Sequence, residues 1–414
     1  MNATTRYISM TMACRPRATM SLCVPTDCRA ILNGEAMSTR DRERYALSRR
    51  TFLRGMAALG AACAAGPLVA ACTPDSGEEI SPTETPMTAP SPTAAATATA
   101  ESEARVSKIS FVKAQTRQEG VHRAVNLLKP NGLSGSRVLV KPNFNTADPS
   151  PGSTHPDTLR GVIGVVKDSG ATQIMLGERS GFGGQGRQPA KQIMAALGIH
   201  EMAKEMGFET LDFDDLDIDG WRKVDFEGSH WPEGFYVPRV LSEVDAVVST
   251  CNLKTHFLGH FTLSLKLAVG FVPIQLPGQS HNYMGDLHFG PGGQSPNLRY
   301  MVAEINTAYE PKLIVMDGLV AFTTGGPSEG TRVDTQVFLA GTDRVAMDAV
   351  GVALLRRWGT TPEVSQGPIF KQEQIARAVE LGLGVSSPEE IELVTDDEES
   401  EAYAAEIRAI LEQG

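Results

Sequence analysis

Two lysines and two histidines lie within one of the most apolar stretches of the chain, residues 251–270, which read CNLKTHFLGHFTLSLKLAVG. Lysine is almost never fully buried without a partner, so Lys254 and Lys266 predict a site that holds a negative charge. His256 is suited to bind a metal ion or to transfer a proton, because imidazole changes its charge near neutral pH. The alternative is that the lysines extend along apolar surface and the histidines are hydrogen-bonded structural groups.

The spacing within this stretch pairs its polar residues. His256 and His260 are four residues apart, and so are Thr262 and Lys266. That spacing places both members of a pair on one face of a helix or of a strand. The alternation of apolar residues across 261–267 favours a strand, whereas the small residues that follow suit the end of a helix. Strand and helix therefore both remain open for this segment.

Polar side chains also lie at the ends of other predicted strands. RVLVKPN ends with Lys141 and Asn143, QIMLGE ends with Glu178, and LIVMDG ends with Asp317. The carboxyl ends of parallel strands meet at one edge of a sheet, where ligands bind. We therefore predict one site in which Lys141 and Asn143 bind substrate. Glu178 and Asp317 act there as catalytic carboxylates, together with the lysines and the histidine of the apolar stretch.

Two further histidines, His281 and His288, lie in a predicted loop, residues 279–293. Together with His256 they predict a three-histidine metal site of the open, catalytic kind. Asp286 or Asp317 would add a carboxylate ligand. The alternative is an irregular surface loop whose histidines have no functional role.

Three other segments have a functional and a structural interpretation. His155 precedes a predicted helix, so it is a substrate-binding residue at the positive helix end or a neighbour of the helix cap. The glycine-rich segment 177–188 binds an anion through backbone N–H groups or forms a lid. The acidic segment 212–220 resembles the start of an EF-hand loop, but Phe226 stands where its last ligand should be, which favours a solvated loop.

Short apolar strands alternate with amphipathic helices along the body of the chain. This order predicts an α/β fold with a mostly parallel sheet flanked by helices, three-layered and Rossmann-like, in one large domain over residues 105–414. The expected strands are 108–114, 137–143, 172–178, 245–250, 312–318 and 335–341. The expected helices are 120–129, 156–170, 188–198, 298–309, 344–358, 371–382 and 400–412.

The N-terminal region has the features of an export signal. Arg49 and Arg50 precede a modest apolar run that ends with small residues before Cys72. Paired arginines predict the twin-arginine export machinery as a partner, and the residues before Cys72 resemble a lipobox, in which that cysteine is lipidated. The alternative is a buried or amphipathic helix that begins with two arginines. Residues 37–72 would be the signal, which predicts a protein anchored to the outer face of the cytoplasmic membrane, on the periplasmic or extracellular side.

The remaining N-terminal residues suggest a late start and a tether. Met37 stands at a suitable distance before the arginines, so residues 1–36 are predicted to be a mispredicted extension. Residues 73–104 are rich in Pro, Thr, Ser and Ala, which is typical of a disordered tether.

Charge and cysteine usage exclude some classes of function. The formal net charge of −11 argues against nucleic acid as a partner, because phosphate binding needs clustered Lys and Arg. Cys251 is the single cysteine of the predicted mature body, so this chain's cysteines form no disulfide within it and no iron–sulfur cluster.

Six ordered motifs resemble the domain-of-unknown-function family numbered 362. They are KPNFN (141–145), THPDTLRGVI (154–163), GE (177–178), LKTHFLGHFTLSLKLAVG (253–270), MDGLVAFTTGGPSEG (316–330) and TDRVAMDAV (342–350). The resemblance extends over roughly residues 108–395 and implies the same α/β fold, without an established activity. Some members of the family carry ferredoxin-type cysteine motifs, which this chain lacks. The family commonly has Lys-Asn after the KTH motif, whereas Leu267 follows Lys266 here.

These observations lead to one main expectation and two rivals. We expect an exported, lipid-anchored enzyme that acts on a small anionic molecule. In one form of this hypothesis the enzyme depends on a bound divalent metal. The first rival is a non-catalytic solute-binding lipoprotein, and the second is a structural envelope protein.

Overall fold

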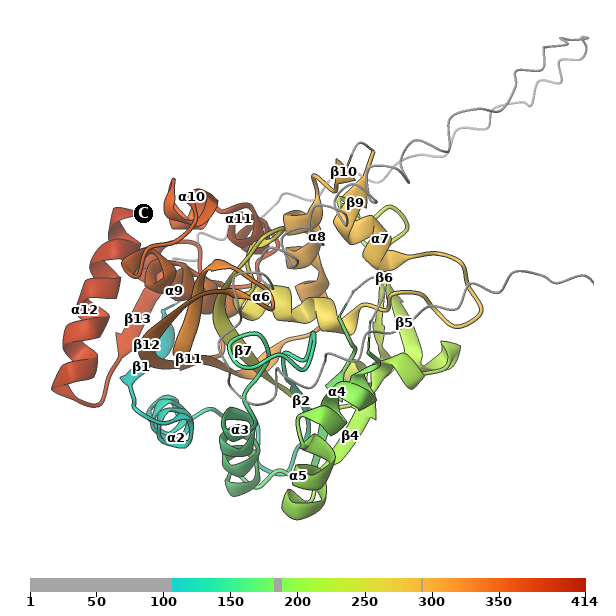
Figure 1. The fold of residues 1–414 in the computed structure, drawn as a ribbon, viewed down its shortest axis with the longest axis horizontal. Helices are drawn as coiled ribbons and strands as arrows, with labels where there is room; N and C mark the ends of the chain where they lie inside the picture. Colours follow the sequence, from blue (N-terminus) through green and yellow to red (C-terminus); the bar gives the residue numbers. More distant parts are fainter. Residues whose placement is uncertain (1–105, 182–187, 292) are drawn as a thin grey trace, which may run out of the picture. The chain divides into compact units, whose positions relative to one another are not determined.

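The computed structural model describes residues 106–181, 188–291 and 293–414, which belong to one compact unit, Thr97–Gly414 (Figure 1). The predictions for the signal, for lipidation of Cys72 and for the tether lie outside the described residues. The same holds for most of the glycine-rich segment, since residues 182–187 are not described.

A nine-stranded sheet forms the centre of the fold, in the order β13-β1-β12-β11-β7-β2-β3-β4, with β8 paired to β7. All of its strands run in one direction except β12 and β8, which are antiparallel to their neighbours. The strands are β1 (Ser107–Lys113), β2 (Arg137–Lys141), β3 (Gln173–Glu178), β4 (Glu209–Asp212), β7 (Ala246–His256), β8 (His260–Phe261), β11 (Pro311–Gly325), β12 (Gly330–Gly341) and β13 (Ile391–Val394). Two small antiparallel pairs are β5 (Trp221–Val224) with β6 (Phe235–Pro238) and β9 (Phe289–Gly290) with β10 (Gly293–Gln294).

Helices follow most of the strands. The α-helices are α2 (Arg117–Leu128), α3 (Pro156–Asp168), α4 (Ala190–Ala196), α5 (Ile199–Met206), α6 (Leu263–Leu267), α7 (Tyr283–His288), α8 (Leu298–Ile305), α9 (Arg344–Arg357), α10 (Pro362–Ser365), α11 (Glu373–Glu380) and α12 (Glu398–Gln413). Short 3-10 helices are η2 (Phe213–Asp215), η3 (Ile218–Gly220), η4 (Arg239–Ser242), η5 (Ala268–Phe271), η6 (Asn306–Ala308), η7 (Ile369–Lys371) and η8 (Pro388–Glu390). No helix within the described ranges is long and apolar enough to cross a membrane.

The helices cover both faces of the sheet. Neighbouring residues of a strand point to opposite faces, and in β2 Val138 and Val140 join one apolar cluster while Leu139 joins another. Figure 1 shows α2, α3 and α5 on one side of the sheet and α8, α9 and α11 on the other. The predicted α/β fold, with helices on both faces of a largely parallel sheet, is confirmed.

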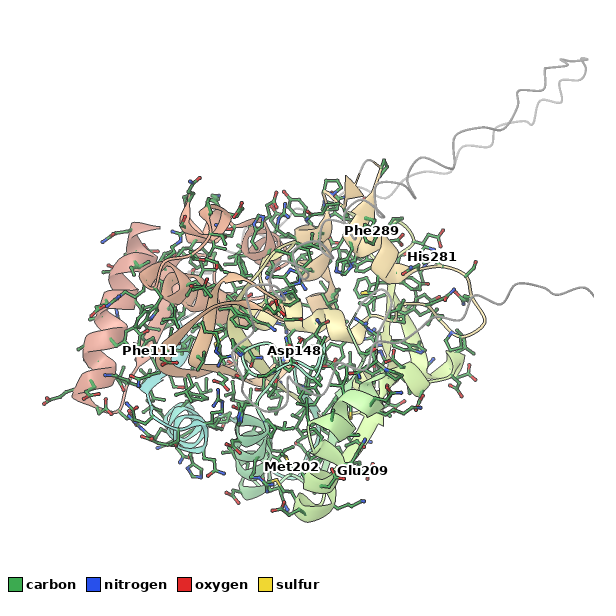
Figure 2. The ribbon with its side chains drawn as sticks, viewed as in Figure 1. Phe111, Asp148, Met202, Glu209, His281 and Phe289 are labelled. Atoms are coloured by element: carbon green, nitrogen blue, oxygen red, sulfur yellow. The ribbon has the colours of Figure 1, made fainter. Side chains whose placement is uncertain are left out.

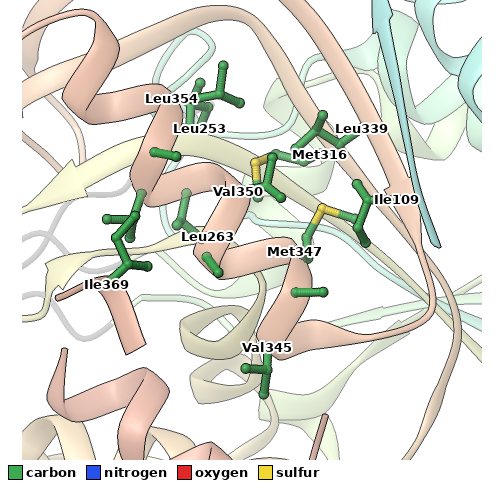
Figure 3. Close-up of a cluster of buried hydrophobic side chains, with 14 of the residues drawn as sticks. Ile109, Leu253, Leu263, Met316, Leu339, Val345, Met347, Val350, Leu354 and Ile369 are labelled. Carbon is green, nitrogen blue, oxygen red and sulfur yellow. The ribbon is translucent and has the colours of Figure 1, made fainter. Parts of the chain in front are cut away.

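The apolar cluster between the sheet and α9 is the largest. Leu253, Met316 and Leu339 from the sheet pack there against Met347 and Val350 of α9 (Figure 3). Helix α9 is buried from Arg344 to Leu355 because other helices also pack on its outer side. This cluster packs the sheet, including β7, against α9.

The segment after β7 is a helix, which settles the alternative left open by its sequence. Residues 260–261 form β8, 263–267 form α6, and 268–271 form η5. The alternation of leucines predicts a strand only when one face is exposed, and here Leu263, Ser264 and Leu265 are all buried. The strand β7 itself extends beyond the expected residue 250 to His256.

Candidate functional site

A pocket opens at the carboxyl edge of the parallel strands, which is where the strand-end argument predicts a site. Its cavity volume is about 60 Å³. Strands β2, β3 and β7 and helix α6 supply its charged groups. Six of the predicted site residues line it, namely Lys141, Asn143, Glu178, Lys254, His256 and Lys266.

Lys141 and Glu178, which both line the pocket, form a buried ion pair. The Lys141 Nζ lies 2.7 Å from the Glu178 carboxylate, and both side chains are almost fully buried. Burial raises the pKa of Glu178 and lowers the pKa of Lys141. The mutual attraction and two backbone N–H donors to the carboxylate, from Phe144 and Arg179, oppose these shifts. The charge of Glu178 is therefore already compensated.

Gly270 makes room for this pair. A Cβ at this position would lie 2.4 Å from Glu178 Oε1 and 2.5 Å from Lys141 Nζ, closer than any side chain could approach. The glycine thus lets the backbone of η5 close over the buried charges.

Lys254 is held by oxygen atoms rather than by a carboxylate. Its Nζ donates to Gly152 O at 2.5 Å, to Pro327 O at 3.1 Å and to Asn143 Oδ1 at 3.4 Å. Burial and the positive charge of Lys266 lower the pKa of Lys254 to about 7. The three acceptors favour the ammonium form and act against this shift. These three acceptors fix the position of the Lys254 Nζ in the pocket.

Lys266 has a different environment. Burial, reinforced by the charge of Arg179, lowers its pKa to about 8. Across the described residues, its Nζ has no hydrogen bond and no ion pair. Thr262, which precedes α6, also lines the pocket, and its buried hydroxyl oxygen has no partner among the same residues. The lining thus includes two polar side chains whose polar atoms have no partner in the described residues.

His256 lines the same pocket in its neutral form. Its Nδ1 accepts backbone N–H groups of Leu258 at 3.1 Å and Gly259 at 3.2 Å. The ring proton is therefore assigned to Nε2. Burial lowers the pKa of His256 well below its usual value, and Lys266 and Lys254 act in the same direction. The Nε2–H group can donate a hydrogen bond to a ligand.

The charges of the pocket do not cancel. Glu178 is the one carboxylate among the lining residues that the structure describes, and it is paired with Lys141. Lys254 and Lys266 also line the pocket, and neither forms an ion pair with a carboxylate of the described residues. A water needs roughly 10–15 Å³ of such cavity volume, so the pocket has room for a group of a few atoms. A small anionic group therefore matches both its charge and its size.

Asp317 lies outside the pocket, so the prediction that it joins the other site residues was wrong. Its carboxylate accepts hydrogen bonds from Thr158 Oγ1 at 2.6 Å and from Arg117 Nε at 2.9 Å. The reason is that β11 does not end at the predicted residue. It continues through a register shift to Gly325, which leaves Asp317 in the middle of the strand.

The other predicted histidines are placed apart from the pocket lining. His155 caps α3, with its Nδ1 accepting from Asp157 N, as the structural alternative expected. His260 pairs with His256 across β7 and β8 but does not line the pocket. Burial and the charge of Arg299 lower its pKa.

The predicted metal ligands are not assembled. His281, labelled in Figure 2, lies just before α7 and contacts Asp286 at 2.7 Å, and His288 Nδ1 contacts Met284 O at 2.9 Å. Within residues 106–181, 188–291 and 293–414, no three His, Cys, Asp or Glu side chains are grouped to hold a metal ion.

The acidic segment 212–220 also has structural roles. Asp212 caps η2, Asp217 accepts from Gly220 N at the start of η3, and Asp215 pairs with Lys191. Two 3-10 turns replace the loop of an EF-hand, so the solvated acidic alternative holds.

Sequence reasoning did not assign Arg179, Thr262 or Gly270 to the site. The spacing between Thr262 and Lys266 was the available signal for the hydroxyl, and Arg179 directly follows Glu178. Cys251 is buried in the apolar cluster, and burial raises its pKa well above its usual value, as expected of a packed side chain.

The comparisons with known proteins place the chain in a family. A thylakoid-associated protein of Synechocystis sp. is 26% identical over 268 residues, which cover 61% of this chain and 75% of that protein. The lactate racemase apoprotein of Thermoanaerobacterium thermosaccharolyticum has a TM-score of 0.35 and 14% identity, covering 58% of this chain. The chain spans 56% of the length of that racemase. The family model for Domain of unknown function (DUF362) matches residues 138–353, more than half of the chain, and the chain belongs to this family.

Proposed function

We propose that this protein is an exported, lipid-anchored enzyme that binds a small anionic molecule in the pocket and transfers a proton to or from it. One observation carries the proposal. Two cationic side chains, Lys254 and Lys266, line a small cavity whose single described carboxylate is already paired with Lys141. Such an arrangement costs folding free energy unless a ligand of opposite charge uses it.

The residues divide the work between binding and proton transfer. The ammonium of Lys254 holds the negative charge, because its position is fixed by three oxygen acceptors. Lys266 transfers the proton, since a pKa of about 8 lies close to neutral pH and general bases work best when their pKa is near the working pH. Neutral His256 donates a hydrogen bond to the substrate from Nε2.

Export and anchoring belong to the same proposal. Arg49, Arg50 and Cys72 would direct the chain to the twin-arginine export machinery and to a lipid anchor. A metal-dependent form of the enzyme would need ligands beyond those grouped in the described residues. Elemental analysis of the protein and of its His256→Ala variant, both purified from the native export route, tests whether the enzyme carries a metal.

The test combines binding and exchange. Oxalate is titrated calorimetrically into the wild type and the Lys266→Met variant, with Lys204→Met on the exposed face of α5 as the matched control. Pyruvate, glycolate and malonate are then followed by NMR in D₂O for exchange of their carbon-bound hydrogens. We expect the wild type and Lys204→Met to bind oxalate and to catalyse exchange of at least one of these acids, and Lys266→Met to lose both.

Two outcomes contradict the proposal in different ways. Binding of oxalate without exchange of any acid would favour the solute-binding lipoprotein over the enzyme. Equal oxalate binding by wild type and Lys266→Met, or no binding by either, would show that the pocket is not an anion site.

A further inference from the structure

The three lysines of the pocket differ in what surrounds the Nζ atom. Lys141 contacts a carboxylate, and Lys254 contacts three oxygen atoms. Lys266 contacts neither type of group in the described part of the chain, although its side chain is largely buried. Of the three ammonium groups, that of Lys266 therefore has the fewest acceptors around it in the described residues. A desolvated lysine beside another cation is the usual form of a nucleophilic amine.

The stem of Lys266 is held in place by packing. A Cβ on Gly259 would come within 3.0 Å of its Cδ and Cε, so the glycine backbone lies directly against the lysine chain. Helix α6 begins at Leu263, and Thr262 precedes it with its hydroxyl in the same pocket. The amine is therefore presented to the cavity on a fixed support.

We propose that Lys266 is a nucleophile that forms an imine with a small 2-oxo acid bound in the pocket. This inference rests on the proposed anion binding, adds the substrate class, and gives Lys266 a covalent role in place of the role of general base. The carboxylate of the acid would be held by the Lys254 ammonium and by the unpartnered Thr262 hydroxyl. The neighbouring carbonyl group would then lie beside Lys266.

The step balances without an oxidant or a reductant. The Nζ lone pair of neutral Lys266 forms a bond to the carbonyl carbon, and the electrons of the C=O π bond move to the oxygen. His256 Nε2–H donates a hydrogen bond to that oxygen as its charge grows. Nζ loses two protons in all, the C–O bond breaks, and the oxygen leaves as one water molecule. Amine and carbonyl compound thus give imine and water.

The experiment traps the imine with glyoxylate, the smallest 2-oxo acid, and sodium cyanoborohydride. The hydride adds to the imine carbon and leaves a carboxymethyl group on the lysine, which is located by peptide mass spectrometry. In the wild type at pH 7.5 we expect Lys266 to be labelled at least about tenfold faster than exposed Lys204, because the Lys266 Nζ lies in the anion pocket without an acceptor and its pKa is lowered to about 8. Oxalate, which forms no imine under these conditions, should protect Lys266.

Two variants complete the experiment. Lys266→Arg keeps a cation but should remove the adduct at this position, whereas Lys204→Arg should leave labelling of Lys266 unchanged. Mapping in the wild type does not depend on the folding of either variant.

Each other outcome overturns a stated part of the account. Oxalate binding without preferential labelling of Lys266 would overturn the imine and leave the proposed function standing. Labelling of Lys254 or Lys141 in preference to Lys266 would overturn the assignment of the nucleophile. Absence of both oxalate binding and labelling would overturn the inference and the proposed function together.

Discussion

Lys141, Lys254 and Lys266 show that the same residue type takes three roles in one pocket. A carboxylate pairs with the first, backbone and amide oxygens hold the second, and no acceptor in the described residues contacts the third. Each arrangement stabilises the ammonium to a different extent. The partner of each Nζ, rather than burial alone, therefore decides which lysine is structural, which binds charge and which is reactive.

Breaking the buried ion pair should be costly. Glu178→Gln leaves Lys141 buried without a compensating charge, which should lower the free energy of unfolding by about 3–5 kcal/mol. Glu205→Gln breaks the exposed pair with Arg160 and should leave the free energy of unfolding nearly unchanged, because solvent screens exposed pairs. Urea unfolding of both variants checks this prediction. Equal losses for the two would mean that the Lys141–Glu178 contact contributes no more than a surface pair.

Lys266→Met should stabilise the protein and change its response to pH. The pKa values of Lys254 and Lys266, about 7 and about 8, lie below the unfolded value of about 10.4. The unfolded chain therefore binds more protons between pH 7 and 10, so these lysines make the free energy of unfolding rise with pH in that window. The variant should be more stable at pH 7 by roughly 1–3 kcal/mol.

The measurement is the free energy of unfolding from pH 7 to 10 for wild type, Lys266→Met and Lys204→Met. The gap between Lys266→Met and wild type should narrow as pH rises, while exposed Lys204→Met follows the wild type. A gap that is constant over this range would mean that Lys266 titrates as an ordinary lysine.

Among the elements, α6 depends on a distant helix for its first turn. Thr262 makes no capping hydrogen bond, and Asp348 of α9 accepts instead from Ser264 N at 2.7 Å and Leu265 N at 3.2 Å. The free N–H groups at the start of a helix need such acceptors. The fully buried Asp348 therefore joins the position of Lys266 to the main apolar cluster.

Asp348→Asn should disturb this support. The amide supplies one acceptor in place of two, so we expect a loss of about 1–3 kcal/mol in the free energy of unfolding and weaker binding of oxalate. Asp397→Ala removes the cap of α12, where Asp397 accepts from Ser400 N, and should cost about 1 kcal/mol without changing oxalate binding. Calorimetric titration of both variants with oxalate tests the predicted difference in oxalate affinity. Unchanged oxalate affinity in Asp348→Asn would show that α6 is held by other contacts.

For the whole molecule, the sequence predicted the alternation of strands and helices and part of the site. Lys141, Glu178 and Lys254 could be placed together because each lies at or near the carboxyl end of a strand. Asp317 could not be excluded, since nothing in its local pattern shows that β11 continues past it. The reversed direction of β12 was equally hidden, because an apolar strand reads the same in a parallel or an antiparallel pairing.

The site residues in turns and at the start of α6 could not be predicted from the sequence either. Arg179 and Thr262 reach the pocket through the turn after β3 and the turn before α6, and turn geometry is not encoded in apolar periodicity. His281 and His288 looked like metal ligands on composition alone, but each has a local partner around α7.

The proposed anchoring is a property of the complete chain. Cys72→Ser should leave the exported protein in the soluble fraction instead of the membrane fraction, because the acyl chains would have no attachment point. Replacing Arg49 and Arg50 by lysine should keep the precursor in the cytoplasm. Fractionation and immunoblotting check both changes. A Cys72→Ser protein that still sediments with membranes and resists salt extraction would contradict the lipid anchor.

The most direct test of the central claim is a crystal structure of the wild-type protein with oxalate. We predict oxalate in the pocket, with carboxylate oxygens about 3 Å from the Nζ atoms of Lys254 and Lys266. Oxalate bound elsewhere, or a pocket that holds no oxalate at concentrations far above its measured dissociation constant, would contradict the claim that this carboxyl edge of the sheet is an anion site.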